Sequence, residues 1–350
     1  MRLIAQPHHL AAALLFLAFT DPAPASFDDS AVARFDYPTW FKTTFYDLED
    51  DLADAREAGK RGIVLFYSTV GCSYCKQMLE GSFAEPGFAA RLHERYDVVG
   101  LEIFSDSEIT DWNGETRTLS EFAKDQGVQF SPTLAFHDTD GRRLLRLVGY
   151  YDTRFLNNAL DYLDSGAAAK MSLREWLDRG DGASPAGTRS TQLTGDPLFA
   201  SPPYQLDRNR QAAERPLLVL FEGSDCMPCA DFHSQVLSEP AIRAALGNFE
   251  LVRLDAGNDS SRLITPDGSA VTASAWHRAL GFSHLPAIAV FDEEGREVVQ
   301  TDALVLRGRF TNLLNYVLDR AYLRGWSYQR YARSESIRRM GERRTDAAKR

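Results

Sequence analysis

The chain has 350 residues, of which 44% are hydrophobic and 25% are charged, and its formal net charge is -10. This length predicts two domains, each with its own core, and the acidic balance argues against nucleic acid as the main partner. The charge is uneven, because residues 320–350 carry ten Lys and Arg against three Asp and Glu. We predict that this basic tail, assigned to 323–350, is solvated and partly helical or disordered; peripheral contact with a membrane surface is the less favoured alternative.

The N-terminal residues 1–25 are predicted to be a cleavable signal peptide. Arg2 precedes an apolar run from Leu10 to Phe19 that is too short to cross a bilayer, and Ala23-Pro24-Ala25 matches a signal-peptidase site. Export would bring the mature chain into an oxidising compartment, where cysteine pairs form disulfides. We therefore expect a periplasmic protein. Residues 26–45, with the aromatic stretch "FDYPTWF", are expected to pack ahead of the first domain.

An internal repeat determines the architecture. Cys72 and Cys75 recur as Cys226 and Cys229, 154 residues later, and "DTDGR" (138–142) recurs at the same offset as "DEEGR" (292–296). The register continues without a gap, which indicates two copies of one domain. All four cysteines of the chain therefore belong to two equivalent Cys-x-x-Cys sites.

The elements predicted along the chain give each copy an α/β fold, a central mixed β-sheet flanked by helices. Helices are expected at 47–60, after Cys72, at 119–127 and 153–163, then after Cys226, at 272–281 and 310–319. Strands are expected at 62–68, 96–103, 132–138 and 142–150, then at 215–222, 249–255, 286–292 and 296–301. The predicted domains are 46–166 and 213–322. Residues 167–212, which include a stretch rich in Gly, Ser, Pro and Thr, are predicted to be a linker.

The order of a strand, Cys-x-x-Cys at a helix start, a helix, a strand, a helix and a proline that opens a hairpin resembles the thioredoxin fold. In that family the proline is cis and lies against the cysteine pair. The resemblance therefore implies that Pro132 and Pro286, with the preceding Ser131 and Leu285, contact substrate. The stretch "GCSYCKQM" (71–78) looks most like periplasmic thioredoxin-related proteins of the SoxW type.

The chain departs from thioredoxin in two respects. Gly71 and Asp225 replace the tryptophan that precedes the first cysteine, and Phe66 and Leu220 replace the buried acid six residues before it. Glu222 and Asp225 could substitute for that acid in the second copy, but we interpret them as ordinary surface acids. His284, two residues before Pro286, is similarly interpreted as a surface histidine.

The spacing of the cysteines predicts their chemistry. Two cysteines three residues apart at a helix start lie within bonding reach, and the helix N-terminus favours a thiolate at the first of them. Cys72 and Cys226 are thus the predicted nucleophiles, and Cys75 and Cys229 the resolving thiols. No metal and no cofactor beyond these disulfides is expected. Inert structural disulfides, one zinc site shared by both pairs and a degenerate binding module remain alternatives.

These features favour an exported thiol–disulfide oxidoreductase. We expect a reductase or electron carrier for periplasmic protein disulfides, recharged by a membrane thiol donor. The nearest alternative is an oxidase or isomerase of the Dsb kind, because Ser73-Tyr74 resembles an isomerase dipeptide. An alternative of a different class is a non-catalytic scaffold, which would be indifferent to replacement of its cysteines.

Overall fold

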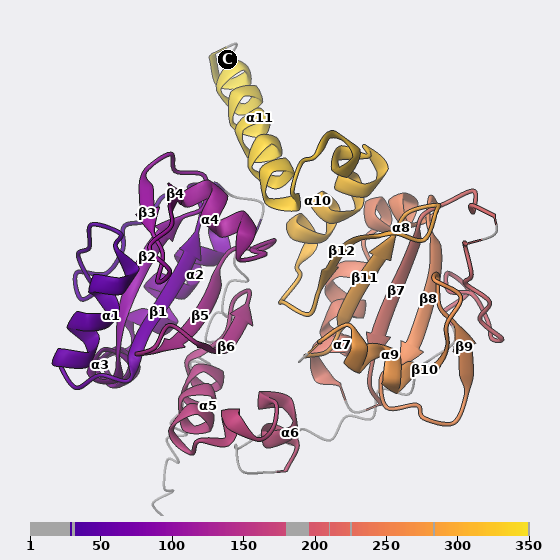
Figure 1. Ribbon diagram of the computed structural model, residues 1–350. Helices are drawn as coiled ribbons and strands as arrows, with labels where there is room; N and C mark the ends of the chain where they lie inside the picture. The colour runs from indigo at the N-terminus through magenta and orange to yellow at the C-terminus, as the bar shows by residue number, and fades with distance from the viewer. Residues whose placement is uncertain are drawn as a thin grey trace, which may run out of the picture.

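The computed structural model describes residues 29, 32–179, 196–209, 211–224, 226–282 and 284–348 (Figure 1). The predicted signal peptide, the middle of the predicted linker and Asp225 lie outside the described residues. Within the described parts of the chain, no helix combines the length and the apolar character needed to span a membrane.

The first domain is built on a four-stranded sheet in the order β2-β1-β5-β6. Strand β1 (Gly62–Ser68) pairs in parallel with β2 (Tyr96–Glu102) and antiparallel with β5 (Thr133–Asp138), which continues into β6 (Arg143–Val148). All seven residues of β1 are buried, because helices cover both faces of the central strand. The other elements are α1 (Leu48–Glu57), α2 (Ser73–Glu80), η1 (Ser82–Ala84), α3 (Pro86–Arg95), β3 (Glu108–Thr110), β4 (Thr116–Thr118), α4 (Leu119–Asp125) and α5 (Thr153–Asp164).

The second domain repeats this topology with a sheet in the order β8-β7-β11-β12. Its strands are β7 (Leu217–Glu222), β8 (Glu250–Asp255), β11 (Ala287–Phe291) and β12 (Glu297–Thr301), with a small hairpin of β9 (Arg262–Ile264) and β10 (Ala270–Thr272). Its helices are α7 (Met227–Phe232), the π-helical turn η3 (His233–Leu237), α8 (Pro240–Leu246), α9 (Ala273–Ala279) and α10 (Arg307–Leu318). The bounds of β9, β10, α9 and α10 are those of β3, β4, α4 and α5 displaced by 154 residues. This confirms the predicted fold class of two tandem α/β domains.

Both domains continue past their last predicted helix, and this corrects two predictions. A 3₁₀ turn and a further helix follow α5, namely η2 (Ala167–Ala169) and α6 (Leu173–Asp178), and the same pair follows α10, namely η4 (Ala321–Arg324) and α11 (Tyr328–Ala348). Leu173 and Trp176 are buried in the core of the first domain, so residues 167–178 are not linker. Tyr328 and Tyr331 are buried in the core of the second domain, so the C-terminal segment is not simply a solvated tail.

Residues at the other end of the predicted linker also pack on a domain. Leu206 belongs to a buried cluster of the second domain, and the buried Arg208 donates hydrogen bonds to the carbonyl of Asp292 and to the carboxylate of Glu250. Residues 196–209 are therefore part of the second domain's shell. The aromatic segment before the first domain packs as predicted, with Phe41 buried in the first core.

The two domains contact each other reciprocally. Figure 1 shows the sheets side by side, with α10 and α11 between them at one end and α5 and α6 at the other. Phe130 of the first domain enters the core of the second, 4.7 Å from the ring of Tyr328. Its counterpart at the 154-residue offset, His284, lies 4.8 Å from the ring of Phe155 in the first domain. Each domain thus presents its C-terminal helices to the cysteine-bearing region of the other.

Candidate active sites

The four cysteines form two separate disulfides, Cys72–Cys75 and Cys226–Cys229, each with 5.2 Å between the Cα atoms. Cys72 precedes α2 and Cys226 precedes α7, and each Sγ accepts the backbone N–H of the second cysteine, at 3.0 Å and 3.1 Å. The first sulfur of each pair thus takes up a donor that the first helical turn leaves unpaired. Because the pairs are separate, one zinc site shared by all four sulfurs is excluded. Among the residues that the structure describes, no group of three or more His, Cys, Asp or Glu could hold a metal ion.

Each domain has one proline that follows a cis peptide bond at the position that the family resemblance implied. The bonds are Ser131–Pro132 and Leu285–Pro286. Ser131 and Cys72 line one cavity, and Leu285, Pro286 and Cys226 line another. Of the predicted site residues, the first cavity thus brings together Cys72 and Ser131, and the second brings together Cys226, Leu285 and Pro286.

Tyr74, the residue before Cys75, fastens the first site to the second domain. The guanidinium of Arg309, on α10, lies over the Tyr74 ring with its carbon 3.6 Å from the ring centroid. The Tyr74 hydroxyl accepts the backbone N–H of Leu306 at 3.0 Å and donates to Asp29 at 2.8 Å. Burial raises the pKa of Tyr74 well above its ordinary value, so the hydroxyl stays a neutral donor.

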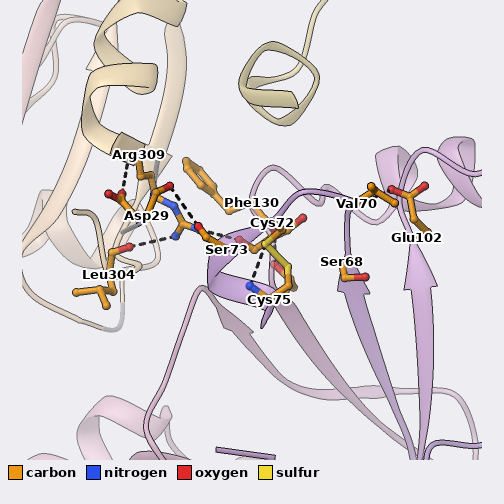
Figure 2. Close-up of a disulfide and its surroundings, with 12 residues drawn as sticks. Asp29, Ser68, Val70, Cys72, Ser73, Cys75, Glu102, Phe130, Leu304 and Arg309 are labelled. Atoms are coloured by element: carbon orange, nitrogen blue, oxygen red, sulfur yellow. Dashed lines mark hydrogen bonds between the residues drawn. A yellow bond between two sulfur atoms is a disulfide. The ribbon is translucent and has the colours of Figure 1, made fainter. Parts of the chain in front are cut away.

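Arg309 also occupies the peptide edge next to the proline. Its Nη2 donates to the carbonyl of Ser131 at 2.7 Å, and its Nη1 donates to the carbonyl of Leu304 at 3.1 Å. Figure 2 shows Arg309, carried by a helix of the second domain, beside the loop that bears the first disulfide. The carbonyl of the residue preceding Pro132 is thus already paired within the chain.

Asp29 joins the N-terminal segment to this contact. Its carboxylate accepts the backbone N–H groups of Gly308 at 2.9 Å and Arg309 at 2.8 Å, at the start of α10 (Figure 2). The residue before α10, Leu306, has no side chain that could cap the helix, so Asp29 supplies the cap from the far end of the sequence.

Helix α11 closes the remaining side of the first site. Tyr328, Gln329 and Arg333 of this helix line the cavity at Cys72, which has a volume of only about 70 Å³. Arg333 also lies 3.5 Å from the carboxylate of Glu102, which in turn accepts the backbone N–H of Val70. Residues of both domains thus leave only a small cavity beside Cys72, although Cys72 itself is half-buried.

The second site has much the larger cavity, although Cys226 is itself more buried than Cys72. Cys226, 8% exposed, lines a cleft of about 810 Å³ between α7 and the first domain's α5 and α6. Apolar and aromatic side chains of both domains line it, namely Tyr150, Tyr151, Phe155, Leu177, Phe232, Val236, Leu285 and Leu304. The cleft is large enough for a bound ligand, since ligand sites typically have volumes of about 300–1,000 Å³.

The acid near the second disulfide is buried, contrary to the sequence interpretation. Glu222, at the end of β7, is 1% exposed, and its carboxylate lies 2.8 Å from Nε2 of His233 and 4.0 Å from Nε of Arg253. Alternation along β7 places Glu222 on the same face as Leu220, under the helical turns that follow the cysteines. All six residues of β7 are buried, so the continuous apolar run 217–221 was the signal that could have marked the next residue, Glu222, as buried. Asp225 lies outside the described residues.

His284 is likewise not a plain surface residue. Its side chain is 21% exposed, its ring packs on Tyr151 and Phe155, and its Nδ1 lies 3.4 Å from the carboxylate of Asp302. It lines the same cleft as Cys226. No motif or spacing in the sequence indicates this domain contact or the roles of Asp29 and Arg309.

Several known proteins are similar to this chain. A family model described as a thioredoxin-like domain matches residues 48–164 and again residues 203–318, together well over half of the chain. A thioredoxin-fold protein from Helicobacter pylori is 22% identical over 34% of this chain and 81% of its own, with a TM-score of 0.29. A thioredoxin from Thermus thermophilus is 21% identical over 30% and 74%, with a TM-score of 0.24. The reduced C-terminal domain of DsbD from Neisseria meningitidis is 16% identical over 29% and 80%, with a TM-score of 0.22. No curated protein matches the sequence.

Proposed function

Because the chain belongs to the thioredoxin-like family, with one family domain in each half, we propose that it is a thiol–disulfide oxidoreductase that uses Cys72–Cys75 and Cys226–Cys229. The observation that carries the proposal is the same at both sites. A cysteine at a helix start is disulfide-bonded to the cysteine three residues on and lies beside a cis-proline peptide. An arrangement in which the first sulfur is stabilised by helix N–H groups suits a thiolate that attacks and leaves.

The exchange reaction runs in two steps. In the reduced protein, the thiolate of Cys226 attacks one sulfur of a substrate disulfide, forming a mixed disulfide and releasing the first substrate thiolate. Cys229 then loses its proton and attacks the Cys226 sulfur, which closes the protein disulfide and releases the second substrate thiolate. Two electrons and two protons pass from the dithiol to the substrate. Cys72 and Cys75 could carry out the same reaction at the first site.

The finer assignment rests on the sequence. We place the protein in the periplasm after cleavage behind Ala25, acting as a reductase or electron carrier for protein disulfides and recharged by a membrane thiol donor, as the resemblance to SoxW-type proteins suggests. Peripheral membrane contact through the basic C-terminal segment is a less favoured part of this assignment. The Dsb-like oxidase or isomerase remains the alternative within enzymes, and the redox-inactive scaffold the alternative outside them.

A redox titration of the mature protein against glutathione and dithiothreitol tests these assignments. It is repeated with Cys72→Ser/Cys75→Ser and with Cys226→Ser/Cys229→Ser, so that each couple is assigned to one site. Couples at or below about -220 mV would support a reductase, and couples near about -120 mV an oxidase or isomerase. If neither pair titrates, the protein is a scaffold. N-terminal sequencing of the exported chain tests the cleavage site, with Ser26 expected first.

A further inference from the structure

The two sites are equivalent in sequence register but differ in what lies over them. Residues of the first site and their counterparts 154 positions away can be compared one by one. Tyr74 corresponds to Pro228, and Ser131 corresponds to Leu285. On the partner domain, Arg309, which lies over the first site, corresponds to Phe155, which lines the second.

These exchanges account for the difference in cavity size between the two sites. At the first site an arginine, a tyrosine hydroxyl and a carboxylate form a network that fastens α10 against the disulfide loop. At the second site the matching positions carry a proline and a phenylalanine, which cannot donate side-chain hydrogen bonds to a carbonyl. The space that Arg309 takes at Ser131 is therefore part of an open apolar cleft at Leu285.

We propose that protein substrates exchange at Cys226, and that the substrate is an extended polypeptide segment with an aromatic or aliphatic side chain next to its cysteine. The segment would lie in the cleft formed by α7, α5 and α6. This inference rests on the proposed oxidoreductase function and adds to it the site used and the class of substrate.

The cleft itself indicates this occupant. Its lining is mainly apolar, with Phe155 and Leu177 from the first domain facing Leu285 and Leu304 from the second. An apolar side chain beside the substrate cysteine would remove these surfaces from water. The first site shows what the carbonyl before the cis-proline can bind, because there the Ser131 carbonyl accepts an N–H of Arg309. A substrate backbone offers the same kind of donor.

The charges at the cleft restrict the substrate further. Apart from His284, six ionisable side chains line the cleft. Four are acidic and two are basic, namely Asp152, Asp231, Asp255 and Asp302, and Arg154 and Arg174. An acidic segment would meet net repulsion there, so neutral or basic flanks are favoured.

Two single-cysteine proteins test the proposal. One is the full mature chain with Cys72→Ser, Cys75→Ser and Cys229→Ser, which keeps only Cys226, and the other keeps only Cys72. Each is mixed with the disulfide-linked dimer of Gly-Phe-Cys-Phe-Gly, with the dimer of Gly-Ser-Cys-Ser-Gly, or with oxidised glutathione. Attack on any of these forms one mixed disulfide and releases one thiol, which is counted by mass spectrometry.

We expect Cys226 to react with the phenylalanine peptide at least about ten-fold faster than with the serine peptide, since burying part of one aromatic ring suffices for this. Cys72 should react with the phenylalanine peptide at least about ten-fold more slowly than Cys226 does. Phe155→Ala, and independently Leu177→Asn on α6, should reduce the preference at Cys226. Phe45→Ala, a matched change at a fully exposed phenylalanine, should leave the preference unchanged.

The outcomes separate this inference from the proposed function. If Cys226 reacts with glutathione disulfide but shows no peptide preference, or if neither cleft variant alters that preference, the cleft is not the substrate site and the oxidoreductase function stands. Equal peptide rates at Cys72 and Cys226 would also overturn the inference. If neither cysteine reacts with any of the three disulfides, the oxidoreductase function itself is wrong.

Discussion

Replacing Arg309 by alanine should open the first site. The two closest contacts that this arginine makes with the first domain are the one over the ring of Tyr74 and the hydrogen bond to the carbonyl of Ser131. The alanine removes both contacts while leaving every residue of the disulfide loop in place. The expected result is a larger population of molecules in which α10 and α11 have moved away from Cys72.

The size of the effect follows from the two contacts. A desolvated cation–π contact contributes about 2 kcal/mol, and a buried hydrogen bond from a charged donor about 1.5–3 kcal/mol. In the wild-type protein Arg309 regains hydration when the site opens, and this offsets part of the two contributions. A net shift of about 2 kcal/mol is therefore expected, which corresponds to roughly a thirty-fold increase in the open population.

Cysteine modification measures this population. The reduced protein with Cys226→Ser and Cys229→Ser is treated with a small maleimide and with a maleimide carrying a long polymer chain, which needs the open site. The Arg309→Ala change should increase the rate with the bulky reagent by about the thirty-fold derived above. The rate with the small reagent should change less, because Cys72 is already partly exposed. Arg309→Lys keeps the charge but loses the planar guanidinium, so an intermediate rate is expected.

An unchanged bulky-reagent rate in a folded Arg309→Ala protein would refute the reasoning, since it would show that Arg309 does not hold the site closed. Asp29→Asn is the independent check. It weakens the cap of α10 and the acceptor of the Tyr74 hydroxyl without touching the arginine. It should shift the modification rate in the same direction, by a smaller factor.

Three further changes test the packing and the charges. A Cβ at Gly149 (φ 102°) would lie 2.5 Å from the Cβ of Ala303 across the domain contact, so Gly149→Ala should cost about 1–3 kcal/mol of stability, and Ala303→Gly should restore part of the lost melting temperature. Burial lowers the pKa of His277 from its ordinary value of 6.5 to about 4. Between these pH values the unfolded chain binds more protons than the folded chain, so the free energy of unfolding should fall as the pH drops from 6.5 to 4. Urea unfolding at several pH values measures this dependence. His277→Gln should reduce the fall by about 1–2 kcal/mol, which is less than the full pKa shift would give because solvent screens the charge in part. His233→Ala removes the nearer partner of the buried Glu222 carboxylate, which then keeps only Arg253 at 4.0 Å among the ion-pair partners described, and should cost about 2 kcal/mol. Simple additivity with Glu222→Gln in a double-mutant cycle would show that the pair is not coupled.

The repeat made most of the fold predictable. In each copy a strand is followed by a cysteine pair, and a proline lies at the same distance after that pair. These features can be recognised in the sequence of one domain. The 154-residue offset then transfers each interpretation from one copy to the other, including the hairpin bounds. Local pattern and register were sufficient because these features depend on contacts within one domain.

The closure of the first site was not predictable in the same way. Asp29, Tyr74 and Arg309 are far apart in sequence, and none of them has a spacing that marks it as a partner of the others. Helix α11 is rich in arginine and has little apolar periodicity, so it resembles a solvated segment. Tyr328, Gln329 and Tyr331 are buried in its first turn, and the two tyrosines belong to the core of the second domain. The corresponding helix of the first domain, α6, is anchored in its core by Leu173 and Trp176. The similarity between these two extensions is harder to recognise in the sequence than the repeat of the cysteine pairs.

The correspondence between Arg309 and Phe155 allows the closure to be tested in the opposite direction. Phe155→Arg would place a guanidinium opposite Leu285, as Arg309 lies opposite Ser131. With one new hydrogen bond to a carbonyl in a partly buried cleft, access of the bulky maleimide to Cys226 should fall by up to about ten-fold. The effect should be weaker than at the first site, because Pro228 replaces Tyr74 and provides no aromatic ring for the guanidinium. If the folded variant keeps its original rate at Cys226, an arginine at this position does not suffice for closure, and the enclosure of Cys72 must depend mainly on α11.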